Sequence, residues 1–221
     1  LGMLATVSTT DARAVSLLWQ ATAAMELTRQ QKVLTFIGTL LGVLLGALDQ
    51  TIVSTALPTI QTQIHIEPAL YVWVTTSYML GSTVLVPVWG KLSDLYGRKP
   101  IMLIGIATFL LGSIACGASQ TTLQLIAARV VQGVGSASLF TTAFAIVADL
   151  FSPAERGKYS GVIGAVFGLS SLVGPLLGGF ITEHFGWHWV FFINVPVGIV
   201  AFAFIFSKMP WLKRVHDKPP R

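Results

Sequence analysis

Charged residues are scarce in this sequence. Only 10% of its 221 residues are Asp, Glu, Lys or Arg, whereas 53% are hydrophobic and the mean hydropathy is +0.74. Soluble domains carry about 25% charged residues, so the composition excludes an ordinary water-soluble domain. Most of the chain is expected to lie in lipid, as an all-α membrane protein.

Cysteine-based sites and phosphate loops are also missing. The single cysteine, Cys116, lies inside an apolar run, which excludes a disulfide framework or a cysteine-based metal site. The four histidines are scattered without ligand spacing, and the absence of a Gly-Lys-Ser/Thr phosphate loop argues against an ATP-driven pump. We expect no cofactor and no metal. We also expect no enzyme activity, because no nucleophile–base pair lies in the apolar runs.

Six apolar runs follow one another, each near the ~20 residues that a helix needs to cross a bilayer. A charged loop, Gly90–Pro100, separates the second run from the third. The predicted spans are Val33–Leu57, Leu70–Trp89, Ile101–Ala118, Leu123–Ala148, Tyr159–Ile181 and Trp189–Phe206. They divide the chain into an N-terminal tail (1–32), a six-helix bundle (33–206) and a C-terminal tail (207–221). We expect Met25 to be the true start and residues 1–24 to be an upstream extension.

Basic residues occupy one side of this topology. Thirteen of the 14 Lys and Arg residues fall in the two tails, the second-to-third loop and the fourth-to-fifth loop. Positively charged loops stay in the cytoplasm, so both tails are predicted to be cytoplasmic in a multi-pass protein of the cell (plasma) membrane. Membrane orientation, not nucleic-acid binding, thus explains the formal charge of +5.

Proline positions and a weak internal repeat refine this topology. Prolines at span ends, where a helix can stop, are Pro58, Pro68, Pro100 and Pro153, and those inside spans are Pro87 and Pro175. Pro87-x-x-Gly90 resembles Pro175-x-x-Gly178, which predicts a bundle of two inverted three-helix repeats, a transporter architecture. Chance similarity of Gly and Pro in membrane helices is the alternative.

Two ionisable residues lie well inside spans, Asp49 in the first and Arg129 in the fourth. Each would cost about 2.5–3.5 kcal/mol at the bilayer centre, so we expect both to face the bundle interior, at similar depth in its outer half. Burial and a neighbouring guanidinium act in opposite directions on a carboxylate. A carboxylate balanced in this way can load and release a proton; a static structural ion pair is the alternative.

The charged loop carries a second candidate site. Gly90 permits close approach of helices, and Gly97 permits a positive φ in a tight turn. Asp94 lies near the inner end of the second span and Asp149 at the inner end of the fourth, so Arg98 is placed to bridge them. The alternative is a solvated loop whose charges only set topology.

Small residues recur along the fifth span at three- and four-residue spacing, and such rows let two helix backbones approach. They are Gly161, Gly164, Gly168, Ser170, Gly174-Pro175 and Gly178-Gly179. From the residues alone, plain helix packing is the favoured interpretation, and a hinge or gate is the alternative.

Five stretches between residues 48 and 198 resemble motifs of one family, in the same order. They are Leu48–Pro58, Gly90–Lys99, Arg129–Gly135, Gly174–Gly179 and Trp187–Gly198. Together they are similar to the major facilitator superfamily, and within it to the fourteen-helix drug:proton antiporters. The chain departs from those motifs at Leu95, where Arg is common, at Ser170, where Gly is common, and at His188, in place of the usual Arg.

The resemblance implies proton coupling by Asp49 and Arg129, in the N-terminal half of an exporter of amphipathic, often cationic, compounds. The implied inner gate consists of Gly90, Asp94, Gly97, Arg98, Lys99 and Asp149. The implied helix-5 antiporter motif, which serves alternating access, consists of Gly168, Gly174, Pro175, Gly178 and Gly179. The implied partners are the lipid bilayer, a small amphipathic substrate, protons and the missing C-terminal half.

Two other functions stay open. One is transport of a metabolite or sugar within the same superfamily, against which the first-span motif argues. The other is a non-transporting membrane fragment, because the chain ends at Arg221, soon after the sixth span, whereas the family needs two six-helix bundles. The number of spans in the complete reading frame distinguishes a fragment from a transporter.

Overall fold

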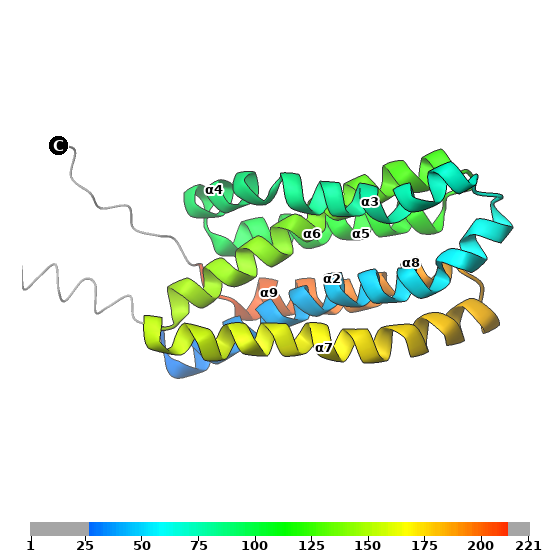
Figure 1. Cartoon of the computed structure of the whole chain (residues 1–221). Helices are drawn as coiled ribbons and strands as arrows, with labels where there is room; N and C mark the ends of the chain where they lie inside the picture. Colours follow the sequence, from blue (N-terminus) through cyan, green and yellow to red (C-terminus); the bar gives the residue numbers. More distant parts are fainter. Residues whose placement is uncertain (1–26, 212–221) are drawn as a thin grey trace, which may run out of the picture.

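A computed structural model describes residues 27–211, and Figure 1 shows them as a bundle of helices. The helices are α2 (Arg29–Gln63), α3 (Pro68–Val84), α4 (Val86–Tyr96), α5 (Arg98–Gly117), α6 (Thr122–Leu150), α7 (Pro153–His184), α8 (Trp189–Phe192) and α9 (Asn194–Lys208). No strand occurs in this described part of the chain. Met25 and most of the two predicted tails lie outside the described residues.

Five helical segments are long and apolar enough to cross a membrane: α2, α5, α6, α7 and the run from α8 into α9. The second predicted span is a bent pair, because α3 and α4 meet at 42° across Leu85. Pro87, near the start of α4, explains the break, since proline lacks the N–H that would continue the hydrogen-bond ladder of α3. With the bent pair counted as one span, the six predicted spans are present.

The first span is longer than the sequence predicts. A helix end is expected at Pro58, but α2 continues through this proline to Gln63. The hydrogen bond that proline cannot form would run to the carbonyl of Ser54, and Ser54 and Pro58 both lie on the exposed face of α2. α2 keeps its helical course through Pro58 without that hydrogen bond.

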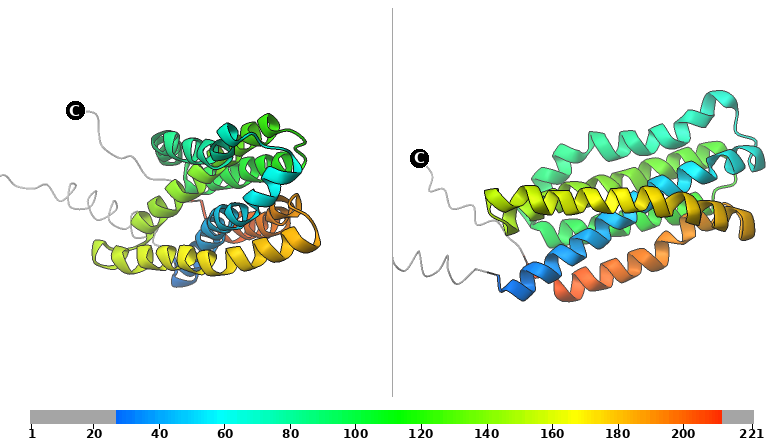
Figure 2. Two further views of the ribbon diagram at one scale, coloured as in Figure 1. Left: turned by 45° about the vertical axis from the view of Figure 1, so that its right-hand side comes forward. Right: turned by 60° about the horizontal axis from the view of Figure 1, so that its bottom comes forward.

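The helices pack in two layers, which Figure 2 shows from two further sides. One layer holds α3, α4, α5 and α6, and the other holds α2, α7 and α9. α6 packs against α3 and α5 as α2 packs against α7 and α9, and α2 and α6 meet between the layers. Exchanging the first three spans with the last three leaves this pattern unchanged, as two inverted three-helix repeats require.

Glycines bring α6 close to its neighbours. A Cβ atom on Gly81 of α3 would lie 2.7 Å from the carbonyl oxygen of Val130, and one on Gly112 of α5 would lie 2.5 Å from the backbone nitrogen of Gln132. Small residues at such contacts let membrane helices meet backbone to backbone. α6 is therefore the tightly packed centre of its layer.

The helix ends that carry basic residues share one end of the bundle. α2 begins, α4 ends and α7 begins at the left of Figure 1, while the α2–α3 and α7–α8 connections lie at the right. Arg98 and Lys99 open α5 at the left end, and Lys208 closes α9 there. The predicted cytoplasmic orientation of this end stays a prediction.

Candidate functional site

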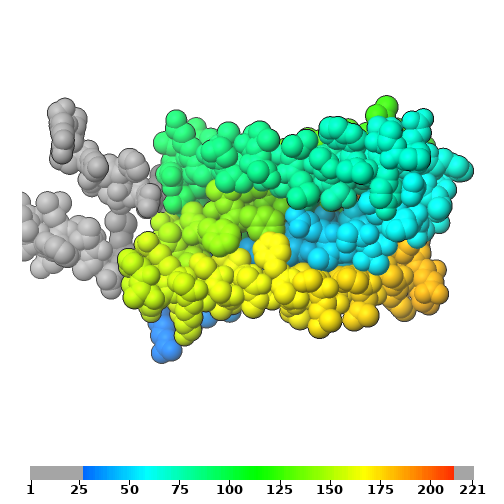
Figure 3. All heavy atoms as spheres, viewed as in Figure 1, coloured from blue at the N-terminus to red at the C-terminus, as the bar shows by residue number. Residues whose placement is uncertain are grey.

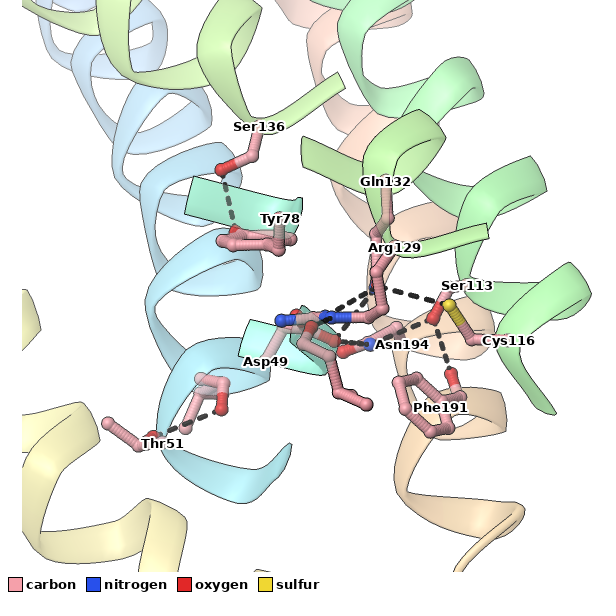
Figure 4. Close-up of polar contacts among 12 residues, drawn as sticks. Asp49, Thr51, Tyr78, Ser113, Cys116, Arg129, Gln132, Ser136, Phe191 and Asn194 are labelled. Carbon is pink, nitrogen blue, oxygen red and sulfur yellow. Dashed lines mark hydrogen bonds and ion pairs between the residues drawn. The ribbon is translucent and has the colours of Figure 1, made fainter. Parts of the chain in front are cut away.

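The centre of the bundle holds Asp49, a fully buried carboxylate on α2. Three side chains donate hydrogen bonds to it, as Figure 4 shows. Arg129 Nη1 donates to Oδ2 at 2.7 Å, while Gln132 Nε2 and Asn194 Nδ2 each donate to Oδ1 at 2.8 Å. Because α6 supplies Arg129 and Gln132 and α9 supplies Asn194, this carboxylate joins the first, fourth and sixth spans.

Arg129 is held by more than its ion pair. Its Nη1 also donates to Gln132 Oε1 at 2.7 Å, and its Nε donates to the carbonyl oxygen of Val74 at 3.3 Å. Its guanidinium lies 4.0 Å from the centroid of the Tyr78 ring, within cation–π range. None of these three contacts depends on the charge of the carboxylate.

Asn194 extends the network to the third span. Its Nδ2 also donates to Ser113 Oγ on α5 at 2.9 Å, and Ser113 Oγ donates to the carbonyl oxygen of Phe191 in α8 at 2.8 Å. Cys116, on the same face of α5, donates through Sγ to Gln132 Oε1 at 3.6 Å. Residues of α3, α5, α6, α8 and α9 thus form one connected polar network around α2.

The sequence predicts that Asp49 and Arg129 both face the bundle interior, and the structure brings them into direct contact. Removing one member of such a buried pair leaves an unpaired charge, at a cost of about 3–5 kcal/mol. Four neutral partners were not predicted: Tyr78, Ser113, Gln132 and Asn194. The contact of Gln132 could have been predicted, because Gln132 lies three residues after Arg129 and so on the same face of the helix. Asn194 had only the weaker signal of an amide in an apolar run.

A second cluster lies at the basic end of the bundle. Arg98 donates through Nη2 to Asp94 Oδ1 and through Nε to Asp149 Oδ2, both at 2.7 Å, and its Nη1 donates to Ser93 Oγ at 2.5 Å. The predicted bridge is therefore present, and it joins α4, α5 and α6. Arg98 is only 4% exposed, so a solvated loop does not describe it.

The two glycines of this cluster differ. Gly97 has a φ of 96°, in the left-handed region that favours glycine, and it lets α5 begin directly where α4 ends. The predicted positive φ is confirmed. A Cβ atom on Gly90 would lie 3.6 Å from Thr141 Cγ2, an ordinary van der Waals contact. The predicted close approach at Gly90 is not seen, because α4 leaves room for a side chain there after the bend.

Lys99 binds a different partner from the rest of the cluster. Its Nζ donates to the carbonyl oxygen of Phe206 at 2.8 Å and lies 5.6 Å from the ring centroids of Phe206 and Trp211. The lysine thus ties the start of α5 to the C-terminal end of α9, where a positive charge is favourable. Its role in an inner gate stays a prediction.

The glycines of the fifth span fall into two groups. Gly174 and Gly178 pack on α2, and a Cβ atom on Gly178 would lie 2.9 Å from a carbonyl oxygen of that helix. No atom lies within 4 Å of a Cβ built on Gly168 or Gly179. Figure 3 shows α7 along one edge of the molecule, with α2 visible between α3 and α7. Helix packing within the described bundle therefore accounts for Gly174 and Gly178 only, and α7 runs unbroken through Pro175.

An all-helical bundle of apolar spans, with a buried carboxylate–guanidinium pair shared by the first and fourth, has the form of a membrane transporter. The family model described as Major Facilitator Superfamily matches residues 39–221. The chain therefore belongs to this superfamily of membrane transporters.

Named relatives and solved structures agree with this assignment. Multidrug resistance protein 3 of Bacillus subtilis is 51% identical over 169 residues, which cover 76% of this chain and 33% of that protein. Efflux pump dotC of Dothistroma septosporum is 43% identical over 187 residues, covering 85% of this chain and 31% of that protein. The chain thus spans about a third of the length of these relatives.

Two solved structures share the fold. A proton:xylose symporter, XylE, superposes with a TM-score of 0.73 at 14% identity, over 81% of this chain and 45% of that one. A bacterial homologue of the human lysosomal transporter Spinster gives a TM-score of 0.72 at 17% identity, over 88% of this chain and 46% of that one. Each is matched over nearly half its length, as expected for one six-helix half.

Proposed function

We propose that this chain forms the N-terminal half of a proton-coupled exporter of amphipathic, often cationic, compounds. The observation that carries the proposal is Asp49, a fully buried acidic group whose three hydrogen-bond donors come from two other spans. A carboxylate placed so deep among membrane helices is typical of proton pathways. Relatives named for multidrug resistance and efflux support drugs or similar compounds as the substrate class.

In the proposed cycle, Asp49 is ionised and paired with Arg129 until a proton arrives from outside. Protonation removes the negative charge, but Arg129 keeps its contacts with Tyr78, Gln132 and the Val74 carbonyl. Its unbalanced positive charge then repels a cationic substrate and favours release outward. Each charge that crosses the field exchanges about 2.3 kcal/mol per 100 mV, so one proton supplies useful work.

The remaining residues are assigned supporting roles in the same proposal. The Asp94–Arg98–Asp149 bridge acts as an inner gate, because opening the cytoplasmic side requires α4 to part from α5 and α6. The glycine row of α7 and Pro175 serve alternating access, with Gly168 and Gly179 facing the second half of the transporter. In the same proposal, both chain termini lie in the cytoplasm.

Replacing Asp49 with asparagine in the complete protein tests the function. The substitution keeps the shape of the side chain and removes the titration, so proteoliposomes should bind substrate but lose transport driven by a pH gradient. Asp49→Glu is the matched control, since it keeps a carboxyl group and should retain part of the transport. A substrate gradient that Asp49→Asn still builds, and that collapses on adding a protonophore, would place proton coupling elsewhere.

A further inference from the structure

We propose that Asn194 is a positioning residue that converts the protonation of Asp49 into a changed contact between α5 and the sixth span. This inference rests on the proposed function, because it takes Asp49 as the proton-binding group. Asn194 is buried, and it is the first residue of α9, directly after Ile193, which joins α8 to α9 with a helical backbone. Its side chain therefore stands at the junction of α8 and α9, where a change in hydrogen bonding can act on the sixth span.

One nitrogen of Asn194 serves two partners. Nδ2 donates to Asp49 Oδ1 at 2.8 Å and to Ser113 Oγ at 2.9 Å, and Ser113 passes the connection to the Phe191 carbonyl at 2.8 Å (Figure 4). This chain of hydrogen bonds from Asp49 to Phe191 thus connects α2, α9, α5 and α8. It suits an ionised carboxylate, which only accepts hydrogen bonds.

A proton on Oδ1 changes what Asp49 requires, because the new hydroxyl must donate. Arg129 has no acceptor atom, and the two acceptor sites of Gln132 Oε1 are already used by Arg129 Nη1 at 2.7 Å and Cys116 Sγ at 3.6 Å. Asn194 can accept once its amide turns so that Oδ1 faces Asp49. The turn also puts Oδ1 in the place of Nδ2 beside Ser113 Oγ, whose single hydrogen is donated to the Phe191 carbonyl. Ser113 can then hold Asn194 only by donating to it and releasing Phe191, so protonation breaks one of the two hydrogen bonds that join α5 to the sixth span.

The titratable groups next to Asp49 do not offer the same switch. Arg129 from α6, Tyr78 from α3 and Cys116 from α5 interact with it electrostatically, while those of α7 and α9 lie near the ends of these helices and α8 has none. The Tyr78 hydroxyl is engaged by Ser136 Oγ at 2.7 Å. The amide of Asn194 can change from donor to acceptor without giving up a contact with Arg129, whereas Gln132 would have to turn away the oxygen that Arg129 Nη1 binds.

The test measures the spacing of α5 and α9 as pH changes. Spin labels are attached to cysteines at Leu111 on α5 and Val200 on α9, two exposed positions, in the complete protein with Cys116→Ala, in lipid nanodiscs. Double electron–electron resonance spectroscopy then gives the distribution of distances between the two spin labels at alkaline and at acidic pH. We expect a shift between the two conditions in the otherwise unsubstituted protein, and loss of that shift in Asp49→Asn.

Two substitutions break the connection while leaving Asp49 in place. Asn194→Leu removes both donor and acceptor, and Ser113→Ala removes the link to Phe191 without touching Asp49; both should lose the pH-dependent shift. Asn194→Gln keeps an amide and should restore part of it, whereas a purely structural role predicts that leucine serves as well. Ser138→Ala is the matched control, because Ser138 Oγ makes a similar interhelical bond to the Ile101 carbonyl at 2.9 Å outside the network.

The outcomes separate this inference from the function on which it rests. Loss of the shift in Asn194→Leu and Ser113→Ala, with a normal shift in Ser138→Ala, supports the role of Asn194. A normal shift in Ser113→Ala, or no shift in the unsubstituted protein, overturns it even if proton-driven export is intact. A shift that persists in Asp49→Asn instead overturns the assignment of Asp49 as the proton-binding group.

Discussion

Replacing Gly133 with alanine tests whether backbone contact between α3 and α6 supports the central site. A Cβ atom there would overlap the carbonyl oxygen of Tyr78 and would lie 3.1 Å from the backbone nitrogen of Ser82. Both obstacles belong to the backbone of α3, so no side-chain rotation removes them. α3 must therefore move away from α6.

The expected cost follows from the size of that movement. A carbon–oxygen contact needs about 3.3–3.6 Å, so α3 moves outward by on the order of 1 Å. That is enough to lengthen the 2.7 Å bond between the Tyr78 hydroxyl and Ser136 Oγ beyond the ~3.0 Å limit typical of such bonds. Overpacking of this kind costs about 1–3 kcal/mol. We expect the upper part of that range, because the obstruction is backbone.

Gly164→Ala is the matched control. This glycine lies in α7, and no atom stands within 4 Å of a Cβ built on it. Both substitutions change the intrinsic helix preference by the same amount, so the difference between the two free energies of unfolding isolates the clash at Gly133.

Cys116 supplies the assay, because it is the only cysteine of the chain and is fully buried. A fluorogenic thiol reagent reacts with it on unfolding, and its reactivity across a titration with denaturing detergent gives the free energy of unfolding. Equal values for Gly133→Ala and Gly164→Ala would refute the argument that α3 and α6 meet backbone to backbone.

Two further predictions concern the basic end of the bundle. Arg98→Ala should insert normally into the membrane but lose most export, because Asp94 and Asp149 are left facing each other. Arg98→Lys should also be impaired, because lysine cannot bind both carboxylates through a planar fork. Normal export by Arg98→Ala would mean that these charges only set the topology. In a Cys116→Ala background, single cysteines at the exposed positions Glu67 and Glu183 should react with a membrane-impermeant thiol reagent from outside intact cells. A single cysteine at Leu95, which is also exposed, should not react. Labelling at Leu95 from outside would show that the predicted orientation is wrong.

Charge made the main contacts predictable. Asp49 and Arg129 lie 80 residues apart, yet lipid leaves a buried charge few options besides a partner of opposite sign. Arg98 was predicted to bridge Asp94 and Asp149 for a different reason, because both aspartates lie at the inner ends of their spans, on the same side of the membrane. Order along the chain and the length of apolar runs were enough to locate the spans, because a bilayer fixes the length of a crossing helix.

Neutral contacts and helix irregularities were not predictable in the same way. An amide inside an apolar run has many possible partners, so nothing in the sequence joins Asn194 to Asp49, 145 residues away. Proline had opposite effects at two positions: α2 continues through Pro58, whereas the second span breaks just before Pro87. Both prolines, and the residues Ser54 and Thr83 whose carbonyls they leave free, are exposed, so position on a helix face does not separate the two cases.

The packing of the bundle also indicates where a charge change at its centre should produce motion. Around Asp49 and Arg129, α3, α5 and α6 meet at glycines with no side chain between their backbones, and this close-packed surrounding strengthens the attraction between the two buried charges. α7 is much less enclosed by the other described helices than α6 is. A change in charge therefore meets close-packed helices on the side of α3, α5 and α6, whereas the exposed face of α7 is the one that we propose to meet the second half of the transporter. We expect α7, held to α2 through Gly174 and Gly178, to be the span that carries the motion to that second half.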